Sequence, residues 1–234
     1  MSIKITLPSK EEVEGKSKVF EKVGAGCGHN YWTSTLSRFA SWHSASEFHV
    51  YPLGEFDSWD VQRGLGVRPV MKSDNLNELI KGCKSYMDNG IQVIEYGKFP
   101  HMLETVKIDD TSVLKETGRE YILPKGNNFT MALERLTEYD YNGQKVVYLG
   151  KYHPIKPAEW YNDEENNMLI SKAVLFESPI NVDNPNYDGS FETSELYGYL
   201  NNEFIKQLIP FMKQFNQKGG EIPNPYGLDL EMVD

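Results

Sequence analysis

The clearest local signal in the sequence is the segment Thr137-Glu138-Tyr139-Asp140-Tyr141-Asn142-Gly143-Gln144-Lys145-Val146-Val147-Tyr148-Leu149. Two strand-like arms, 137–141 and 145–149, are separated by the Asn-Gly pair. Asn and Gly both tolerate the positive φ angles that a type I′ turn requires, and this turn suits the twist of paired antiparallel strands. The segment therefore predicts a β-hairpin, and with it a fold that contains antiparallel sheet.

Further strands are expected on both sides of this hairpin. A second hairpin is predicted with arms at 158–161 and 168–176, joined by a turn at Asp163-Glu164-Glu165-Asn166. Glu47-Phe48-His49-Val50-Tyr51 alternates in polarity as a half-buried strand does, and Pro52 ends it. Gly66-Val67-Arg68-Pro69-Val70 indicates a short buried strand with Pro69 at its edge, and residues 91–96 indicate another strand.

About three helices are predicted. The first begins at Ser9, which forms a capping box with Glu12, and it ends in the glycine-rich loop 24–28. The second begins at Ser73 or Asp74, follows an apolar face through Met87 and ends at Asn89-Gly90. The third begins near Thr193, with Leu196, Leu200, Phe204 and Leu208 on one face, and Pro210 stops or kinks it. A short helix is also expected around 112–116.

A few helices combined with short, mostly antiparallel strands predict the α+β class. No internal repeat or linker divides the chain, so residues 1–234 are expected to form a single domain. Within it, 97–128 is a candidate insertion and 218–234 is expected to be a surface tail rich in Gly, Pro and Asn.

Composition narrows the functional classes. The 234 residues are 39% hydrophobic and carry a net charge of −10, which argues against a nucleic-acid or anionic-membrane surface. No apolar run is long enough to span a bilayer, and no secretory signal opens the chain. Two cysteines outside any CxxC motif favour a reduced compartment. A cytoplasmic location, or one within a phage particle, is therefore expected.

Several segments resemble known domains. Tyr31-Trp32-Thr33-Ser34-Thr35, Phe48-His49-Val50 and Gly66-Val67-Arg68-Pro69-Val70 resemble the core signature of C-type-lectin-like domains of the sulfatase-modifying and phage variable-protein kind. The chain also resembles an uncharacterised domain family of gut Firmicutes and their phages, through residues 95–100, 138–143, 157–160, 169–172 and 199–204. The resemblance implies a single lectin-like domain with a display surface, and it implies no reaction.

The segment between the lectin-like motifs is the first candidate site. Trp, Arg and His at a surface combine a large contact area with polar tips, as binding hot spots do. The alternative is that the tryptophans fill a core, above all Trp32, and that Arg68 forms a buried ion pair. The expected ligand-binding residues are Arg38, Trp42, His43, Glu47, His49, Phe56, Asp57, Trp59, Asp60, Gln62 and Arg63.

A second candidate is a calcium-binding loop at 184–195, whose oxygen donors and Gly189 follow the spacing of an EF-hand. Its first donor is Asn184 rather than Asp, and the alternative is an Asn/Gly/Pro turn that leads into a helix. A third candidate is Cys27, which His29 would activate as a base. Neither Cys27 nor Cys83 lies in a motif that matches the paired cysteines of sulfatase-modifying enzymes.

These observations favour a non-catalytic binding protein that recognises a protein or a glycan through residues 38–63. No cofactor, metal, nucleic acid or membrane is expected, and the oligomeric state stays open. Two alternatives are a phage-encoded protein, either a virion surface component or an inhibitor of a host defence protein, and a cysteine-dependent enzyme.

Overall fold

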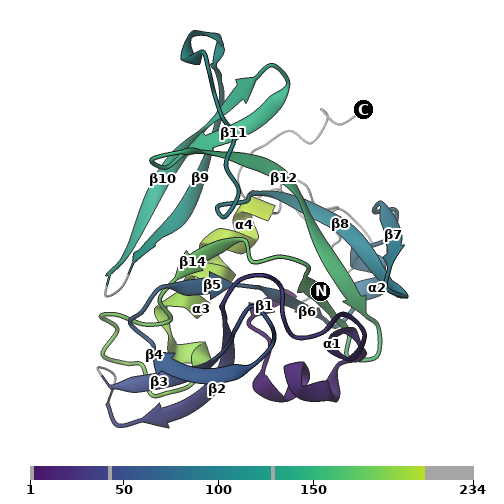
Figure 1. Cartoon of the computed structure of the whole chain (residues 1–234), viewed down its shortest axis with the longest axis vertical. Helices are drawn as coiled ribbons and strands as arrows, with labels where there is room; N and C mark the ends of the chain where they lie inside the picture. The colour runs from purple at the N-terminus through teal and green to yellow at the C-terminus, as the bar shows by residue number, and fades with distance from the viewer. Residues whose placement is uncertain (1–2, 42–43, 128–129, 209–234) are drawn as a thin grey trace, which may run out of the picture.

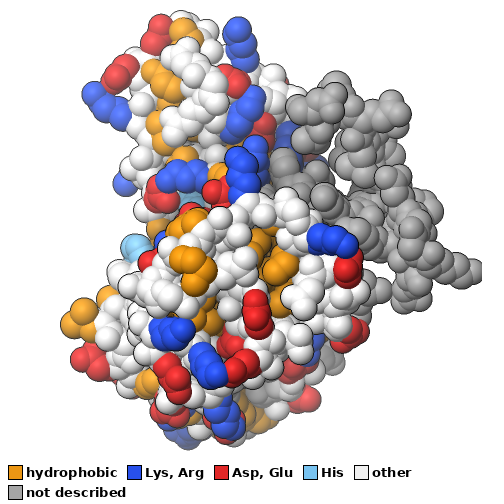
Figure 2. Space-filling model, turned by 90° about the vertical axis from the view of Figure 1, so that its right-hand side faces the viewer, with side chains coloured by type: hydrophobic (Ala, Val, Ile, Leu, Met, Phe, Trp, Pro, Cys, Tyr) orange, Lys and Arg blue, Asp and Glu red, His pale blue; other side chains and the backbone are white. Residues whose placement is uncertain are grey.

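The computed structural model describes residues 3–41, 44–127 and 130–208, and it is built mainly from antiparallel sheet with short helices (Figure 1). Among the described residues, strands take 46% and helices 19%. None of the described helices is long and apolar enough to cross a membrane. On the face shown in Figure 2, acidic and basic side chains are interspersed.

The larger sheet has nine strands in the order β1-β6-β13-β12-β11-β10-β9, and β8 pairs with both β12 and β7. Its strands are β1 (Ile3–Thr6), β6 (Val70–Ser73), β7 (Ser85–Asp88), β8 (Ile91–Pro100), β9 (Lys115–Asn127), β10 (Thr130–Tyr141), β11 (Gln144–Tyr148), β12 (Tyr152–Asp163) and β13 (Met168–Ser171).

The smaller sheet has five strands in the order β14-β5-β2-β3-β4. They are β2 (Tyr31–Phe39), β3 (Ala45–Val50), β4 (Phe56–Asp60), β5 (Leu65–Val67) and β14 (Phe176–Ser178). The β2–β5 pair is parallel and the others are antiparallel.

The helices are short. In chain order, η1 (Glu12–Lys16) and α1 (Lys18–Val23) come first, and α2 (Leu76–Leu79) and η2 (Thr111–Val113) lie singly in the middle of the sequence. The last four follow one another closely and form the C-terminal helix: η3 (Phe191–Thr193), α3 (Glu195–Tyr199), η4 (Leu200–Phe204) and α4 (Ile205–Leu208).

Both predicted hairpins are present. Tyr141 pairs with Gln144 across Asn142 (φ 53°) and Gly143 (φ 88°), which gives the expected turn. In the second hairpin, Trp160 pairs with Ser171 and Asp163 with Met168. The second arm ends at Ser171, and Phe176 pairs with Val67 in the smaller sheet instead.

The first and third helices lie where they were predicted. Glu12 N–H donates to Ser9 Oγ (3.1 Å) and Ser9 N–H donates to the Glu12 carboxylate (2.7 Å), so the capping box is present. Gly15, at φ 128°, divides this first helix into η1 and α1. Leu196, Leu200, Phe204 and Leu208 are fully buried on the C-terminal helix. Pro210 and the expected tail 218–234 lie outside the described residues.

The prediction of a helix from Ser73 to Met87 is wrong beyond its first turn. α2 ends at Leu79, Gly82 has φ 76°, and Met87 lies in strand β7. Asn89 (φ 50°) and Gly90 (φ 73°) form the turn of a β7–β8 hairpin rather than a helix cap. Apolar spacing in this segment resembled a helix face, but the Asn-Gly turn decided the local structure.

Two further segments differ from expectation. Residues 66–70 form no single strand, because Pro69 separates β5 from β6 and the chain passes from one sheet to the other there. The region 97–128 holds the end of β8 and all of β9, whose Tyr121 and Leu123 are fully buried. The expected helix around 112–116 is the single turn η2, and β9 already begins at Lys115.

The main core lies between the two sheets and the C-terminal helix. Phe99 of β8 packs against Phe204 of η4 at 4.7 Å between ring centroids, and against Phe176 of β14 at 5.9 Å. Trp32 of β2 and Trp160 of β12 are fully buried within the same cluster. This core holds the smaller sheet in a fixed position, and the candidate site lies on that sheet.

Candidate functional site

The register of the smaller sheet gathers several expected site residues on one face. Glu47 lies opposite Trp59 in the β3–β4 pair, and His49 lies opposite Asp57. On the other side of β3, His49 lies opposite Trp32 of β2. Directly opposed residues share a sheet face, so this face combines aromatic rings with three titratable groups.

His49 is the centre of this group. It is 1% exposed, and its ring lies 4.9 Å from that of Tyr51, 5.6 Å from that of Trp59 and 6.1 Å from that of Trp32, between centroids. We call these four residues the His49 cluster. Burial lowers the pKa of His49, against the opposing effect of Asp57, so the imidazole is neutral at pH 7. Neither ring nitrogen has a hydrogen-bond partner among the described residues.

Glu47 lies beside the cluster and is fully buried. Its Oε1 accepts a 2.9 Å hydrogen bond from the Tyr187 hydroxyl, whereas Oε2 has no partner among the described residues. Burial raises the pKa of this carboxyl to about 8, although the hydrogen bond from Tyr187 acts in the opposite direction. Glu47 is therefore mostly protonated at pH 7, with hydrogen-bonding capacity that the chain does not use.

The rim of the cluster reaches solvent. Asp57 is exposed and accepts hydrogen bonds from Ser58 N–H (2.7 Å) and the Tyr51 hydroxyl (3.1 Å), which lower its pKa. Trp59 is half-buried, and the Arg63 guanidinium lies 4.8 Å from its ring centroid. The rim therefore presents an aromatic surface flanked by one cation and one anion.

The other expected residues lie apart from this rim. Arg38 is exposed further along β2. Phe56 is on the opposite face of β4, where Lys10 Nζ lies 5.5 Å from its ring. Asp60 and Gln62 stabilise the turn after β4 through a hydrogen bond from Gln62 N–H to Asp60 Oδ1 (2.9 Å). Trp42 and His43 lie outside the described residues.

Arg68 has a different environment from the one expected. Arg68 is 1% exposed, and its guanidinium carbon lies 5.1 Å from the ring centroid of Phe20 and 5.2 Å from that of Tyr31. It donates to the carbonyl oxygens of Ser171 (2.8 Å) and Ala25 (3.4 Å). Its third recorded partner is the Tyr31 hydroxyl (3.4 Å), and no carboxylate pairs with it in the described part of the chain, so the alternative of a buried ion pair is wrong.

The loop 184–195 uses its oxygen atoms internally. Asp188 Oδ1 accepts from Ser190 N–H (2.9 Å) and the Thr193 hydroxyl (2.8 Å), and Glu195 accepts from two backbone N–H groups. These bonds form the turn that leads into α3. Among the described residues, no group of three or more His, Cys, Asp or Glu side chains is placed to hold a metal ion.

Among the described residues, no contact between the Cys27 thiol and the His29 imidazole is present. Its Sγ lies 3.7 Å from the backbone carbonyl oxygen of His29, and the His29 side chain is exposed. The loop 24–28 therefore places the Cys27 thiol beside the backbone of His29 and not beside its imidazole, the expected base.

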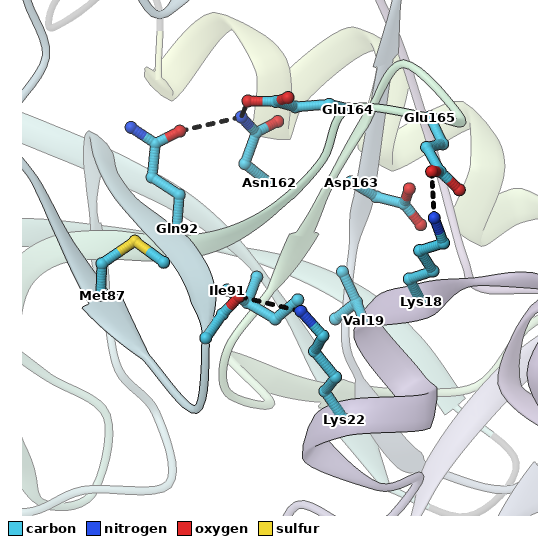
Figure 3. A pocket seen from close by; sticks show the side chains of 11 residues that line it. Lys18, Val19, Lys22, Met87, Ile91, Gln92, Asn162, Asp163, Glu164 and Glu165 are labelled. Carbon is cyan, nitrogen blue, oxygen red and sulfur yellow. Dashed lines mark hydrogen bonds and ion pairs between the residues drawn. The ribbon is translucent and has the colours of Figure 1, made fainter.

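Sequence reasoning missed a pocket of about 480 Å³ on another part of the molecule. Helix α1, the β7–β8 turn and the turn after β12 line it (Figure 3). Its polar groups are Lys18, Lys22, Gln92 and the run Asn162–Glu165. The sequence predicts the run 163–166 only as a turn, and no sequence signal indicates that α1 packs against this turn.

Comparisons with known proteins identify no relative. No protein-family model matches the chain, and neither a curated protein nor a solved structure matches it.

Proposed function

We propose that this chain is a non-catalytic binding protein that recognises a protein partner through the β3–β4 face. The observation that carries the proposal is the unmet hydrogen-bonding capacity of His49, which is buried directly behind the half-exposed Trp59. A buried polar group without a partner costs about 1–3 kcal/mol, and a bound partner that supplied the missing bonds would recover that cost.

The position of β4 supports a protein as the partner. β4 forms one edge of the smaller sheet, so its outer backbone groups face no other described strand. An extended peptide can add to such an edge through main-chain hydrogen bonds, with side-chain pockets providing specificity. Trp59 and Arg63 belong to the residue types that most often dominate binding energy.

In this proposal the smaller sheet is the display surface of a C-type-lectin-like domain. Two of the three segments that carry the resemblance lie side by side, since Tyr31 of β2 pairs with Gly66 of β5. A glycan at the same face is the second candidate, because aromatic rings beside a carboxylate, such as Trp59 beside Asp57, also suit sugar rings.

The experiment combines photo-crosslinking with a binding titration. A photoreactive amino acid at the exposed position Asp57, on the same face of β4 as Trp59, should crosslink a partner in host lysate, and the partner should then be expressed and titrated by calorimetry. We expect Trp59→Ala to weaken binding at least about tenfold, the loss typical of a hot-spot residue.

Tyr148→Ala is the matched control, because Tyr148 is also an exposed aromatic residue (51%) but lies on β11 of the larger sheet. It should bind as the unmodified chain does. If Trp59→Ala binds as tightly as Tyr148→Ala, the β3–β4 face is not the recognition surface. A glycan array probed with the same proteins decides between the two ligand classes.

A further inference from the structure

The pocket between α1 and the β12–β13 turn contains a fixed hydrogen-bond acceptor. Asn162 is 7% exposed, and its Nδ2 donates to Gln92 Oε1 (3.0 Å) and Glu164 Oε1 (3.3 Å) (Figure 3). These bonds use both N–H groups of the amide and hold it in one orientation. Asn162 Oδ1 has no partner among the described residues, although it is buried.

The pocket also offers donors and an apolar surface. Lys22 Nζ donates to the Gly90 carbonyl oxygen (3.1 Å), which uses one of its three N–H groups. Val19 and Ile91 contribute buried apolar side chains, and Met87 is 65% exposed at the edge. A ligand here would meet an acceptor, a donor and a hydrocarbon patch within one cavity.

The charges in the pocket restrict the ligand class. Lys18 pairs with Glu165, and the other charged residues that line the pocket are Lys22, Asp163 and Glu164. A phosphate or other dianion would face these two carboxylates, so the site does not favour it. An uncharged hydroxylated ring fits better, because each hydroxyl both donates and accepts and the ring presents C–H groups to the apolar patch.

We propose that this pocket binds one neutral sugar ring, either a free monosaccharide or the terminal residue of a glycan. In this site a sugar hydroxyl donates to Asn162 Oδ1, Lys22 donates to a second sugar oxygen, and Val19 and Ile91 contact the ring. The site is separate from the β3–β4 face, since β4 and α1 lie on different sides of the molecule in Figure 1. The proposal therefore goes beyond partner recognition by that face.

The test is a titration of the ¹⁵N-labelled chain with neutral hexoses and N-acetylhexosamines, followed by NMR. We expect the side-chain amide signals of Asn162 and Gln92 to shift with a dissociation constant of about 1–10 mM, as befits so small a ligand. Asn162→Leu should weaken binding at least about tenfold, because it removes the buried acceptor. Methyl glycosides of the same sugars distinguish a terminal glycan residue, which tolerates the methyl group, from a free sugar.

Two further variants keep the test decisive. Lys22→Met retains the hydrocarbon stem and should weaken binding several-fold, even if Asn162→Leu fails to fold. Lys107→Met is its control, because Lys107 is 88% exposed and lies outside the pocket. Trp59→Ala should leave the sugar-induced shifts of the pocket amides unchanged, because Trp59 does not line the pocket, so this site and the β3–β4 face can fail independently.

Three outcomes overturn the proposal. One is that no sugar in the panel shifts the pocket amides. Another is that Asn162→Leu, shown to be folded, binds as the unmodified chain does. The third is that a free amino acid, titrated in parallel, shifts the pocket amides where sugars do not, which would assign the pocket to zwitterions.

Discussion

Asn201 and Gln207, six positions apart on the C-terminal helix, bind the backbone of β1 and β9, the first and last strands in the order of the larger sheet. Asn201 accepts from Ile5 N–H (2.8 Å) and donates to Ile5 C=O (2.7 Å) in β1. Gln207 makes the same pair of bonds with Ile122 of β9, at 2.7 and 2.9 Å. Each amide therefore takes the place of a neighbouring strand at one end of the strand order.

Asn201→Ala should lower the free energy of unfolding by about 2 kcal/mol, because it leaves the N–H and C=O of the fully buried Ile5 without their partners. Urea denaturation followed by circular dichroism measures the change. Asn202→Ala is the matched control, since Asn202 is exposed and donates only to Gly198 C=O within its own helix. The control should change stability by less than about 0.5 kcal/mol. Equal losses in both variants would show that the edge contact contributes nothing.

Glu47 should make the protein less stable as the pH rises from about 5 to 8. Its folded-state pKa of about 8 lies above the ordinary value of 4.5, so the folded chain keeps a proton that the unfolded chain releases in this interval. The contribution is fully present below about pH 4.5 and is lost as the pH passes 8, with a slope of about 1 kcal/mol per pH unit.

Glu47→Gln should remove this slope, because glutamine keeps an acceptor for the Tyr187 hydroxyl and does not titrate. Glu177→Gln, at an exposed position of β14, should retain it. Unfolding free energies measured at pH 5, 6.5 and 8 for the three proteins give the comparison. A parallel pH dependence in all three would mean that Glu47 is ionised in the folded chain.

His49→Phe should stabilise the isolated chain by about 1 kcal/mol at pH 7.5, because phenylalanine suits the aromatic surroundings and removes two unpaired nitrogens. The gain should grow below pH 6.5, since the lowered pKa of His49 makes the unmodified fold lose stability as the pH falls. The same variant should weaken binding of the partner. Thermal unfolding measures the first effect, with the exposed His29→Phe as control. A destabilised His49→Phe would show that the imidazole is already satisfied in the free protein.

Arg68→Lys should lower the free energy of unfolding by about 2–3 kcal/mol, because an ammonium group can neither bond to the same set of oxygens in a planar fork nor offer a flat surface to the rings of Phe20 and Tyr31. Arg135→Lys provides the comparison, since Arg135 is 64% exposed and pairs with Glu120 on the surface. That variant should stay within about 0.5 kcal/mol of the unmodified chain in chemical denaturation. Similar stability in the two variants would mean that Arg68 has no structural role.

Local chemistry was predictable wherever one short segment decides its own conformation. The Asn142-Gly143 turn, the Ser9–Glu12 capping box and the apolar face that includes Leu200 were all predicted and are present. Each depends on neighbours within a few residues, so the sequence contains all the information required. The prediction of a helix through Met87 was wrong because the apolar spacing of this segment fits both a helix face and a strand. The Asn89-Gly90 turn that follows favoured the strand.

The sequence by itself determined the Asn142-Gly143 hairpin, the capped start of the first helix and the residue types available to the face that includes Trp59. Only the tertiary structure decided which of these side chains stay accessible, because burial depends on packing between segments far apart in the chain. Burial in the folded chain raises the pKa of Glu47 to about 8, although Tyr187, 140 positions away, donates a hydrogen bond that acts in the opposite direction. Likewise, the pocket at Asn162 exists only because α1 and the β7–β8 turn meet beside β12.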